Sequence, residues 1–106
     1  MNAAVTPLRW SLTLYISGAS PRSTAAIDTV RRMCDKELAG LIELEIIDVY
    51  DQPGLAAAAK VIATPTLVKN LPAPVRRLVG DLSNVDFVRH GLDLGPLRPL
   101  PGPNDG

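Results

Sequence analysis

Cys34 and His90 are the only cysteine and the only histidine in this sequence. A single cysteine cannot form an internal disulfide, a Cys-x-x-Cys redox pair or a cysteine-rich zinc site. Cys34 also falls on a helical apolar stripe, which favours a buried small side chain over a nucleophile. His90 has no obvious cysteine, serine or aspartate partner nearby, and we expect it on the surface at a helix end. These two residues predict neither thiol chemistry nor a histidine-based metal site.

The carboxylates and hydroxyls that could support catalysis have simpler structural interpretations. Asp48 and Asp51 could form a carboxylate pair, but Asp51 is well placed to cap a helix. Ser20 and Ser23 are interpreted as caps rather than nucleophiles. No phosphate-binding loop of the G-x-x-x-x-G-K-[ST] or G-x-G-x-x-G kind occurs. The sequence therefore predicts no enzyme, no cofactor and no metal.

The distribution of charged residues is more informative about function than the candidate catalytic residues are. Lys+Arg and Asp+Glu are both 11, which argues against general nucleic-acid or polybasic membrane binding. This balance hides an asymmetry, because residues 1–53 hold seven acids and five bases while residues 54–106 hold four acids and six bases. The segment 55–79 has no acid and four bases: Lys60, Lys69, Arg76 and Arg77. A basic patch suits an acidic protein surface, although a solvated face explains any single residue about as well.

The first half of the chain has clear elements. Residues 8–17 alternate between apolar and polar types, which predicts a half-buried strand. Ser20 and Pro21 then open a helix as its cap and first residue. Residues 41–49 predict a second strand, and the usual handedness of a strand–helix–strand unit makes the two strands parallel.

The second half gives weaker signals. Residues 52–60 can form a short helix capped by Asp51, and residues 66–69 and 75–79 can form two short strands. A strand over 75–79 points its two adjacent arginines to opposite faces, so at most one of them shares a face with Lys69. The element order is then βαβ followed by αββα, which is an α/β fold of the thioredoxin-like type.

The last helix has its own start signal. Ser83-x-x-Asp86 is a capping box, and the residues after it carry apolar side chains at helical spacing. Gly91 falls inside this stretch, where glycine weakens a helix by about 1 kcal/mol relative to alanine. The last helix is therefore expected to be short.

Proline is unusually frequent, with ten residues in 106. Four lie in residues 95–106, which we interpret as a flexible Pro/Gly-rich tail after a domain spanning residues 1–94. Three others crowd a region whose local signals conflict: Pro65, Pro72 and Pro74. The Thr64–Pro65 bond precedes the third strand, where a thioredoxin-like fold carries a cis-proline, and is a candidate for that geometry.

Several stretches of the sequence resemble the KaiB family of circadian clock proteins, from about residue 12 to residue 94. In the first half they are residues 12–18, the helix start Ser20-Pro21-x-Ser23 and residues 46–49. In the second half they are residues 63–67, 71–77, 80–83 and 91–94. The run from 63 to 83 is specific, because a chance match over so many ordered positions is improbable.

The resemblance implies a non-enzymatic circadian clock component that binds the N-terminal ATPase ring of the KaiC hexamer and regulates its phosphorylation cycle. It implies two further partners, a KaiA-type protein and a thioredoxin-like sensor kinase. It also implies slow fold switching between a ground-state homotetramer or dimer, arranged βαββααβ, and a monomer with the thioredoxin-like arrangement that binds KaiC. Both arrangements share the first βαβ half. We expect such a protein in the cytoplasm.

The resemblance also assigns residues. The basic positions that it implies for partner contact are Lys69, Arg76 and Arg77, and Lys60 belongs to the same basic segment. The residues that it implies for the fold switch are Pro65, Pro72, Pro74, Gly91 and Asp93. The three prolines would be the isomerising bonds, which makes switching slow, since an uncatalysed X-Pro bond takes ~10–100 s to isomerise. Gly91 and Asp93 lie where the last segment changes between helix and strand.

Two features depart from the family pattern. Ala73 stands between Pro72 and Pro74, where the family often has three consecutive prolines, and it removes one isomerising bond. The tail is rich in proline and glycine with a single acid, Asp105, where the family often ends in an acidic tail. These departures suit a divergent family member paired with a non-standard KaiC.

Two other functions remain open. The same fold could serve as a stress-adaptation or signalling module that binds another partner, such as a sensor kinase. A thioredoxin-like enzyme with a non-cysteine site is the third hypothesis. The missing cysteine pair weighs against it, because no thiolate stands at the start of the first helix.

Overall fold

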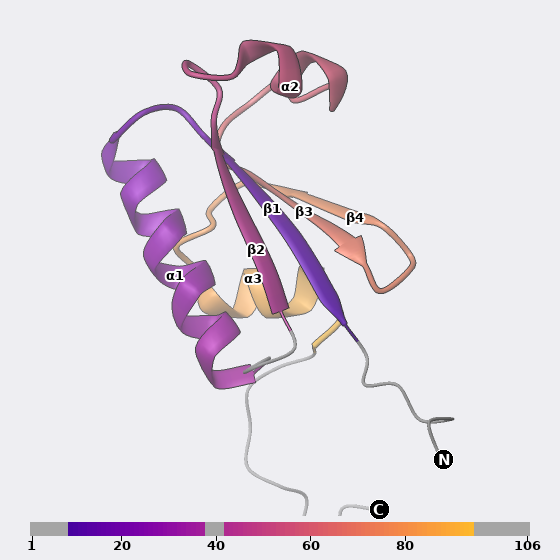
Figure 1. Ribbon diagram of the computed structural model, residues 1–106. Coiled ribbons are helices and arrows are strands. Elements are labelled where there is room, and N and C mark those ends of the chain that lie inside the picture. The colour runs from indigo at the N-terminus through magenta and orange to yellow at the C-terminus, as the bar shows by residue number, and fades with distance from the viewer. Residues whose placement is uncertain (1–8, 38–41, 95–106) are drawn as a thin grey trace, which may run out of the picture.

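The computed structural model describes residues 9–37 and 42–94. This part of the chain forms one four-stranded sheet and three helices, which Figure 1 labels. In chain order they are β1 (Trp10–Ile16), α1 (Pro21–Glu37), β2 (Ile42–Asp48), α2 (Pro53–Ala58), β3 (Thr66–Leu71), β4 (Arg76–Val79) and α3 (Val85–Gly91). The predicted order of elements, βαβ followed by αββα, is confirmed.

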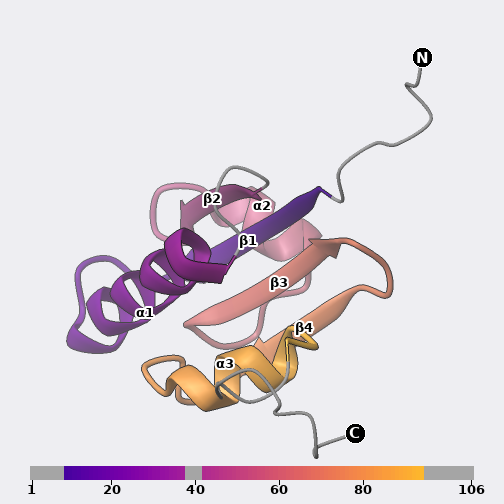
Figure 2. The same cartoon turned by 90° about the horizontal axis from the view of Figure 1, so that it is seen from below.

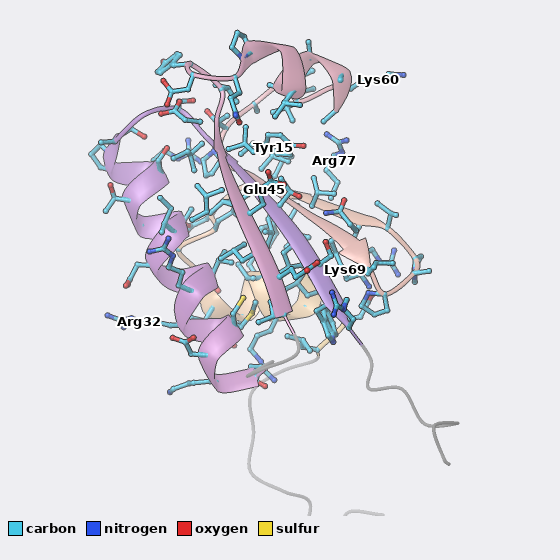
Figure 3. All side chains as sticks on the ribbon, viewed as in Figure 1. Tyr15, Arg32, Glu45, Lys60, Lys69 and Arg77 are labelled. Carbon is cyan, nitrogen blue, oxygen red and sulfur yellow. The ribbon has the colours of Figure 1, made fainter. Side chains whose placement is uncertain are left out.

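The sheet has the strand order β2-β1-β3-β4, so β2 and β4 are its edges. β1 and β2 are parallel, as predicted, and β3 runs antiparallel to both β1 and β4. One row of paired residues crosses all four strands, from Glu45 through Thr13 and Val68 to Arg77. Residues paired in this way project from the same face, so Glu45 and Arg77 stand on one face at opposite edges (Figure 3).

The main core lies between the sheet and the helices α1 and α3 (Figures 1 and 2). Its fully buried side chains include Leu14 from β1, Val30 from α1, Leu67 from β3 and Val88 from α3. Burying a side chain of this size contributes about 1.5–3 kcal/mol. The predicted apolar stripe of the first helix is confirmed at Ile27, Val30 and Cys34, which contact this core, while Leu38 lies outside the described residues.

The sequence predicts one polar face for β1, and this prediction is wrong. Thr13 and Tyr15 are buried like their apolar neighbours. Tyr15 packs with Ile47 and Val68 in a second, smaller core, which is covered by residues before and after α2: Val49, Ala59 and Val61. A central strand between two layers loses its polar face, and alternation in the sequence cannot show that the second layer exists.

The start of α1 follows the sequence prediction. The Ser20 side-chain oxygen accepts a hydrogen bond from the backbone N–H of Ser23 at 3.2 Å, and Pro21 is the first helical residue. The Ser20 carbonyl accepts from the N–H of Thr24 at 2.9 Å. Serine as cap and proline at the first position therefore set where α1 begins.

The start of α2 differs from the prediction. The N-cap is Gln52 rather than Asp51, it makes no side-chain cap bond, and the helix is shorter than residues 52–60. The N–H groups of Asp51 and Gln52 both donate to the Asp48 carbonyl, at 3.0 and 2.9 Å. Asp51 therefore lies within a turn that follows β2, which takes it out of the capping position.

The cap of α3 also differs by one residue. Asn84, not Ser83, is the N-cap, and its side-chain oxygen accepts from the N–H of Phe87 at 3.0 Å. Ser83 turns back to Asp81 instead, which accepts from its N–H and from its hydroxyl. The capping-box spacing is therefore present in the sequence while the loop uses its serine elsewhere.

The second-half strands are close to their predicted positions. β3 extends two residues beyond the expected 66–69, and β4 begins one residue later than 75–79. The Thr64–Pro65 bond is cis, as predicted, and the Leu71–Pro72 and Ala73–Pro74 bonds are cis as well. The predicted tail, residues 95–106, lies outside the described residues, so that division of the chain stays a prediction.

Asn84, which caps α3, and Ser83, which does not, give a matched pair of variants. We expect Asn84→Ala to lower the free energy of unfolding by about 1 kcal/mol, because it removes the acceptor of the Phe87 N–H. Ser83→Ala should cost less, since the Ser83 N–H still donates to Asp81. Urea unfolding followed by circular dichroism measures both. A larger loss for Ser83→Ala would contradict the cap assignment.

Candidate partner-binding surfaces

α3 ends in a hydrogen-bonded turn that places Asp93. The N–H of Asp93 donates to the His90 carbonyl at 3.0 Å, and that of Leu94 donates to the Arg89 carbonyl at 2.8 Å. This is a Schellman motif, whose left-handed position is usually glycine. Here that position is Asp93, with φ of 65°. An aspartate tolerates this backbone conformation better than most residues, and it adds a carboxylate at the helix end.

The Asp93 carboxylate joins two cations from the β3–β4 hairpin. Its Oδ2 lies 3.2 Å from Lys69 Nζ and 3.1 Å from Arg76 Nε. Lys69 is only 2% exposed, and its ammonium also lies 5.6 Å from the centre of the Trp10 ring. The hydrogen bond from Arg76, and to a smaller extent the one from Lys69, holds the pKa of the Asp93 carboxyl below its ordinary value. We call Lys69, Arg76 and Asp93 the Asp93 cluster.

Arg77 projects from the opposite face of β4 to Arg76 and binds the backbone after α2. Its Nη2 donates to the Ala59 carbonyl at 2.6 Å, and its Nη1 donates to the Lys60 carbonyl at 3.3 Å. Lys60 has a left-handed backbone, with φ of 59°, and an exposed side chain. Arg77 thus fixes the turn that presents Lys60, and Figure 3 shows both beside α2.

The four predicted bases therefore do not form one patch. Lys69 pairs with Arg76 across the strands and shares its face, while Arg77 lies on the opposite face, as the parity of a strand requires. Three of the four are engaged with groups of the chain itself. Lys60 is left as the exposed lysine of the segment. Partner contact for all four stays a prediction.

Large apolar side chains are exposed along the segment that contains α2. Ile62 is 96% exposed, Tyr50 75% and Leu55 48%. All three lie in the segment 50–62, at the end of the sheet where β1 and β2 finish (Figure 1). We call Tyr50, Leu55, Lys60 and Ile62 the α2-end surface.

The apolar members of this surface were not predicted from the sequence. Ile62 follows Val61 between a short helix and a cis-proline, so no strand or helix period assigns it to a face. Large apolar side chains exposed in one short segment make that segment a candidate interaction surface. The one signal in the sequence is that Tyr50, Leu55 and Ile62 belong to no apolar stripe of a predicted helix or strand.

The loop between β1 and α1 holds a network of hydroxyl groups. The Ser17 N–H donates to Ser23 Oγ at 3.2 Å, and the hydroxyls of Ser17 and Thr64 are hydrogen-bonded to each other. Ser20 Oγ donates to Ser23 Oγ at 2.9 Å. Asp48 closes the loop, because its carboxylate accepts from the N–H groups of Gly18 and Tyr50. These hydroxyls hold the loop together. Ser20 is the cap that the sequence predicts, but the prediction of Ser23 as a cap is wrong, because Ser23 lies inside α1 and its Oγ accepts from the Ser17 N–H.

A second ionic contact that the sequence did not reveal joins α3 to α1. Arg89 is 5% exposed and pairs with Glu37 at the last turn of α1. The hydroxyl of Thr29 in α1 also donates to the Ser83 carbonyl, at 3.3 Å, just before α3. α3 is therefore held at both ends by polar contacts between the two halves of the chain.

The expected positions of Cys34 and His90 agree with the structure. Cys34 is buried, and burial raises the pKa of its thiol to about 11, so almost no thiolate forms near neutral pH. His90 is exposed in the last turn of α3. Among the described residues, no group of three or more histidine, cysteine, aspartate or glutamate side chains could hold a metal ion. Residues 9–37 and 42–94 also contain no helix that is long and apolar enough to cross a membrane.

The predicted fold-switch residues lie around the hairpin and α3. Pro65 precedes β3, while Pro72 and Pro74 lie between β3 and β4. Gly91 ends α3 so close to β4 that a Cβ there would stand 2.2 Å from Leu78 Cδ2. Asp93 follows at the centre of the Asp93 cluster. Their role in switching stays a prediction.

Because the pKa of Asp93 is lowered, the free energy of unfolding depends on pH in the acid range. A carboxylate whose folded pKa is depressed stabilises the fold above its unfolded value of about 3.9, and this contribution is lost as the pH falls through the folded value. We expect the urea midpoint of the chain to drop more steeply below about pH 4 than that of Asp93→Asn. Asp81, whose pKa Ser83 lowers, remains in both proteins, so the difference reports Asp93. Parallel curves would refute the assignment.

Comparison with known proteins identifies the family. The KaiB domain matches residues 13–94. The circadian clock oscillator protein KaiB of Thermostichus vulcanus is 49% identical over 90 residues, covering 83% of each chain. The circadian clock protein KaiB3 of Synechocystis sp. is 47% identical over 85 residues, covering 80% of this chain and 83% of the relative.

Solved structures confirm the thioredoxin-like fold. The N-terminal domain of Synechococcus elongatus SasA superposes with a TM-score of 0.68 at 26% identity, covering 88% of this chain and 91% of that domain. Mitochondrial thioredoxin 3 of Saccharomyces cerevisiae gives 0.65 at 14% identity, covering 81% and 78%. The thioredoxin-like fold is the arrangement that the resemblance to the KaiB family implies, and the family match covers residues 13–94. The chain therefore belongs to the KaiB family of circadian clock proteins, which are not enzymes.

Proposed function

We propose that this chain is a clock component that binds the N-terminal ATPase ring of a KaiC-type hexamer through the α2-end surface and so regulates its phosphorylation cycle. The observation that carries the proposal is that Ile62, two positions after Lys60, is 96% exposed in a member of a family of clock proteins. Covering an isoleucine of this exposure contributes about 1.5–3 kcal/mol to a complex. Lys60 adds a cation that favours an acidic partner surface and faster association.

The other predicted contact residues have distinct parts in this proposal. Arg77 positions Lys60, because its guanidinium holds the carbonyls on either side of the Ala59–Lys60 bond. Arg76 is half exposed and can reach a partner while it pairs with Asp93. Lys69 is buried in this arrangement, so its effect on binding would run through the position of Asp93.

Fold switching is the second element of the proposal. The thioredoxin-like arrangement would be the partner-binding monomer, and a homotetramer or dimer with the second half rearranged would be the resting form. Support comes from α3, a helix of seven residues whose position depends on Asp93, Arg89 and the close contact of Gly91. A protein that switches before it binds has an association rate that stops rising at high partner concentration.

A second candidate partner is a sensor kinase or a KaiA-type protein. The likeness to the N-terminal domain of SasA raises such a protein as a candidate, because two domains of one fold can compete for one partner. A pull-down that recovers a kinase and no KaiC-type ATPase would favour this candidate. As the partner of such proteins, the chain would act in the cytoplasm.

A pair of matched variants tests the α2-end surface. We expect Ile62→Asp to weaken binding to the cognate KaiC-type hexamer about tenfold or more, a change of ~1.4 kcal/mol, and Lys60→Glu to slow association. Val85→Asp is the control, since Val85 is 45% exposed on α3, away from α2. Size-exclusion chromatography and titration measure the complexes, with a phosphomimetic ATPase included.

Two results would contradict the proposal. One is an equal loss for Val85→Asp and Ile62→Asp, which would show that the surface has no special role. The other is the absence of any complex after a day of mixing with the phosphomimetic hexamer. Folding of every variant is checked by its circular dichroism spectrum.

A further inference from the structure

β4 is an edge strand with an open side. It is the last strand in the order β2-β1-β3-β4, and its four residues pair with β3 alone among the described strands. An unpaired strand edge can accept an extended segment of another chain through main-chain hydrogen bonds. α3 packs against β4, and Figures 1 and 2 place β4 at the outside of the sheet.

A groove of about 370 Å³ runs along this edge. All four residues of β4 line it, together with Phe87, His90 and Gly91 of α3 and with Asp93. Two close approaches set its walls. Gly91 lets α3 come against Leu78, and the Phe87 ring lies 3.2 Å from where a Cβ on Gly80 would stand. A strand edge on one side and a helix on the other is the shape that receives an extended peptide.

The groove is apolar at one part and cationic at another. Val79 is 50% exposed and Phe87 39%, so both can contact an apolar side chain. Arg76 and Arg77 supply the cationic lining, from opposite faces of β4. The carboxylate in the lining, Asp93, is already held by Lys69 and Arg76. An acidic side chain is therefore the charged group that this groove suits.

Charge also selects between occupants. Two copies of this chain joined β4 to β4 would bring the adjacent arginines Arg76 and Arg77 of both copies together. Like charges opposite each other on neighbouring strands are destabilising. A charged edge of this kind blocks indiscriminate pairing and leaves acidic strands as acceptable partners.

We propose that β4 accepts an extended segment of a partner protein as a fifth strand, with apolar side chains on the α3 side of the sheet, toward Phe87, and acidic side chains on the opposite side, toward Arg77. This site is separate from the α2-end surface. The proposal rests on the open edge, the groove and its charge, and it does not require the KaiC-type partner.

Peptide titration of the full chain tests it. The probe is an acetylated, amidated hexapeptide of alternating glutamate and valine, and the control peptide replaces each glutamate by lysine. We expect the glutamate peptide to move the backbone amide resonances of residues 76–79 and 87–91 and to slow hydrogen exchange in β4 about threefold or more. Added salt should weaken binding. The lysine peptide should have neither effect.

A matched pair of variants locates the site. Phe87→Ala should weaken the glutamate peptide about fivefold (~1 kcal/mol), while Val85→Ala, an exposed apolar residue of the same helix outside the groove, should change it less than about twofold. Three results would overturn the proposal: shifts centred on residues 50–62, equal binding of the two peptides, or no shift with peptide up to about 5 mM. Broadening of β4 resonances that grows with protein concentration without peptide would assign the edge to a second copy instead.

Discussion

The second half of this protein is organised around one buried ammonium group. Lys69 has 2% of its surface exposed and finds its carboxylate in Asp93, which belongs to the turn after α3. The same oxygen accepts from Arg76 on the neighbouring strand. A buried charge without a partner is strongly unfavourable. β3, β4 and α3 are therefore constrained together, because moving any one of them separates the ammonium from its carboxylate.

The two halves of the chain are held by different means. β1 is central in the sheet, pairs on both sides and is buried on both faces, so the first half has extensive apolar packing. α3 has seven residues, too few to be stable as an isolated helix. It depends on the Asn84 cap, the ion pair of Arg89 with Glu37 and the turn at Asp93. Polar contacts of this kind can be exchanged for others, whereas the packing around β1 cannot be moved without losing the core.

Local sequence patterns predicted much of the fold because they carry local physics. Ser20 with Pro21 and the parity of Arg76 and Arg77 follow from short-range rules, whereas the cis bond before β3 was predicted from its place in a thioredoxin-like fold. The α3 cap did not follow, because Ser83 and Asn84 are both good caps and the loop's contact with Asp81 decides between them.

The candidate site was harder to predict, because its key contacts join residues that are distant in the sequence. The sequence around Lys69 does not indicate that Asp93, 24 positions later, supplies the carboxylate that pairs with its ammonium group. Arg89 and Glu37 are farther apart still, in different halves. The exposed Ile62 had no periodic pattern around it, so its exposure is decided by how α2 ends and by Arg77 holding that end.

Lys69 and Ile62 together invert the usual distribution of side chains. A lysine lies inside and an isoleucine lies almost wholly in water, whereas folding energetics favour the reverse. A buried ion pair adds little stability compared with apolar packing of similar volume, and its best-supported use is to specify one arrangement among several. An exposed isoleucine is unfavourable only until a partner covers it. Both residues thus cost the isolated chain stability, and the proposed fold switch and the proposed partner would each account for one of these costs.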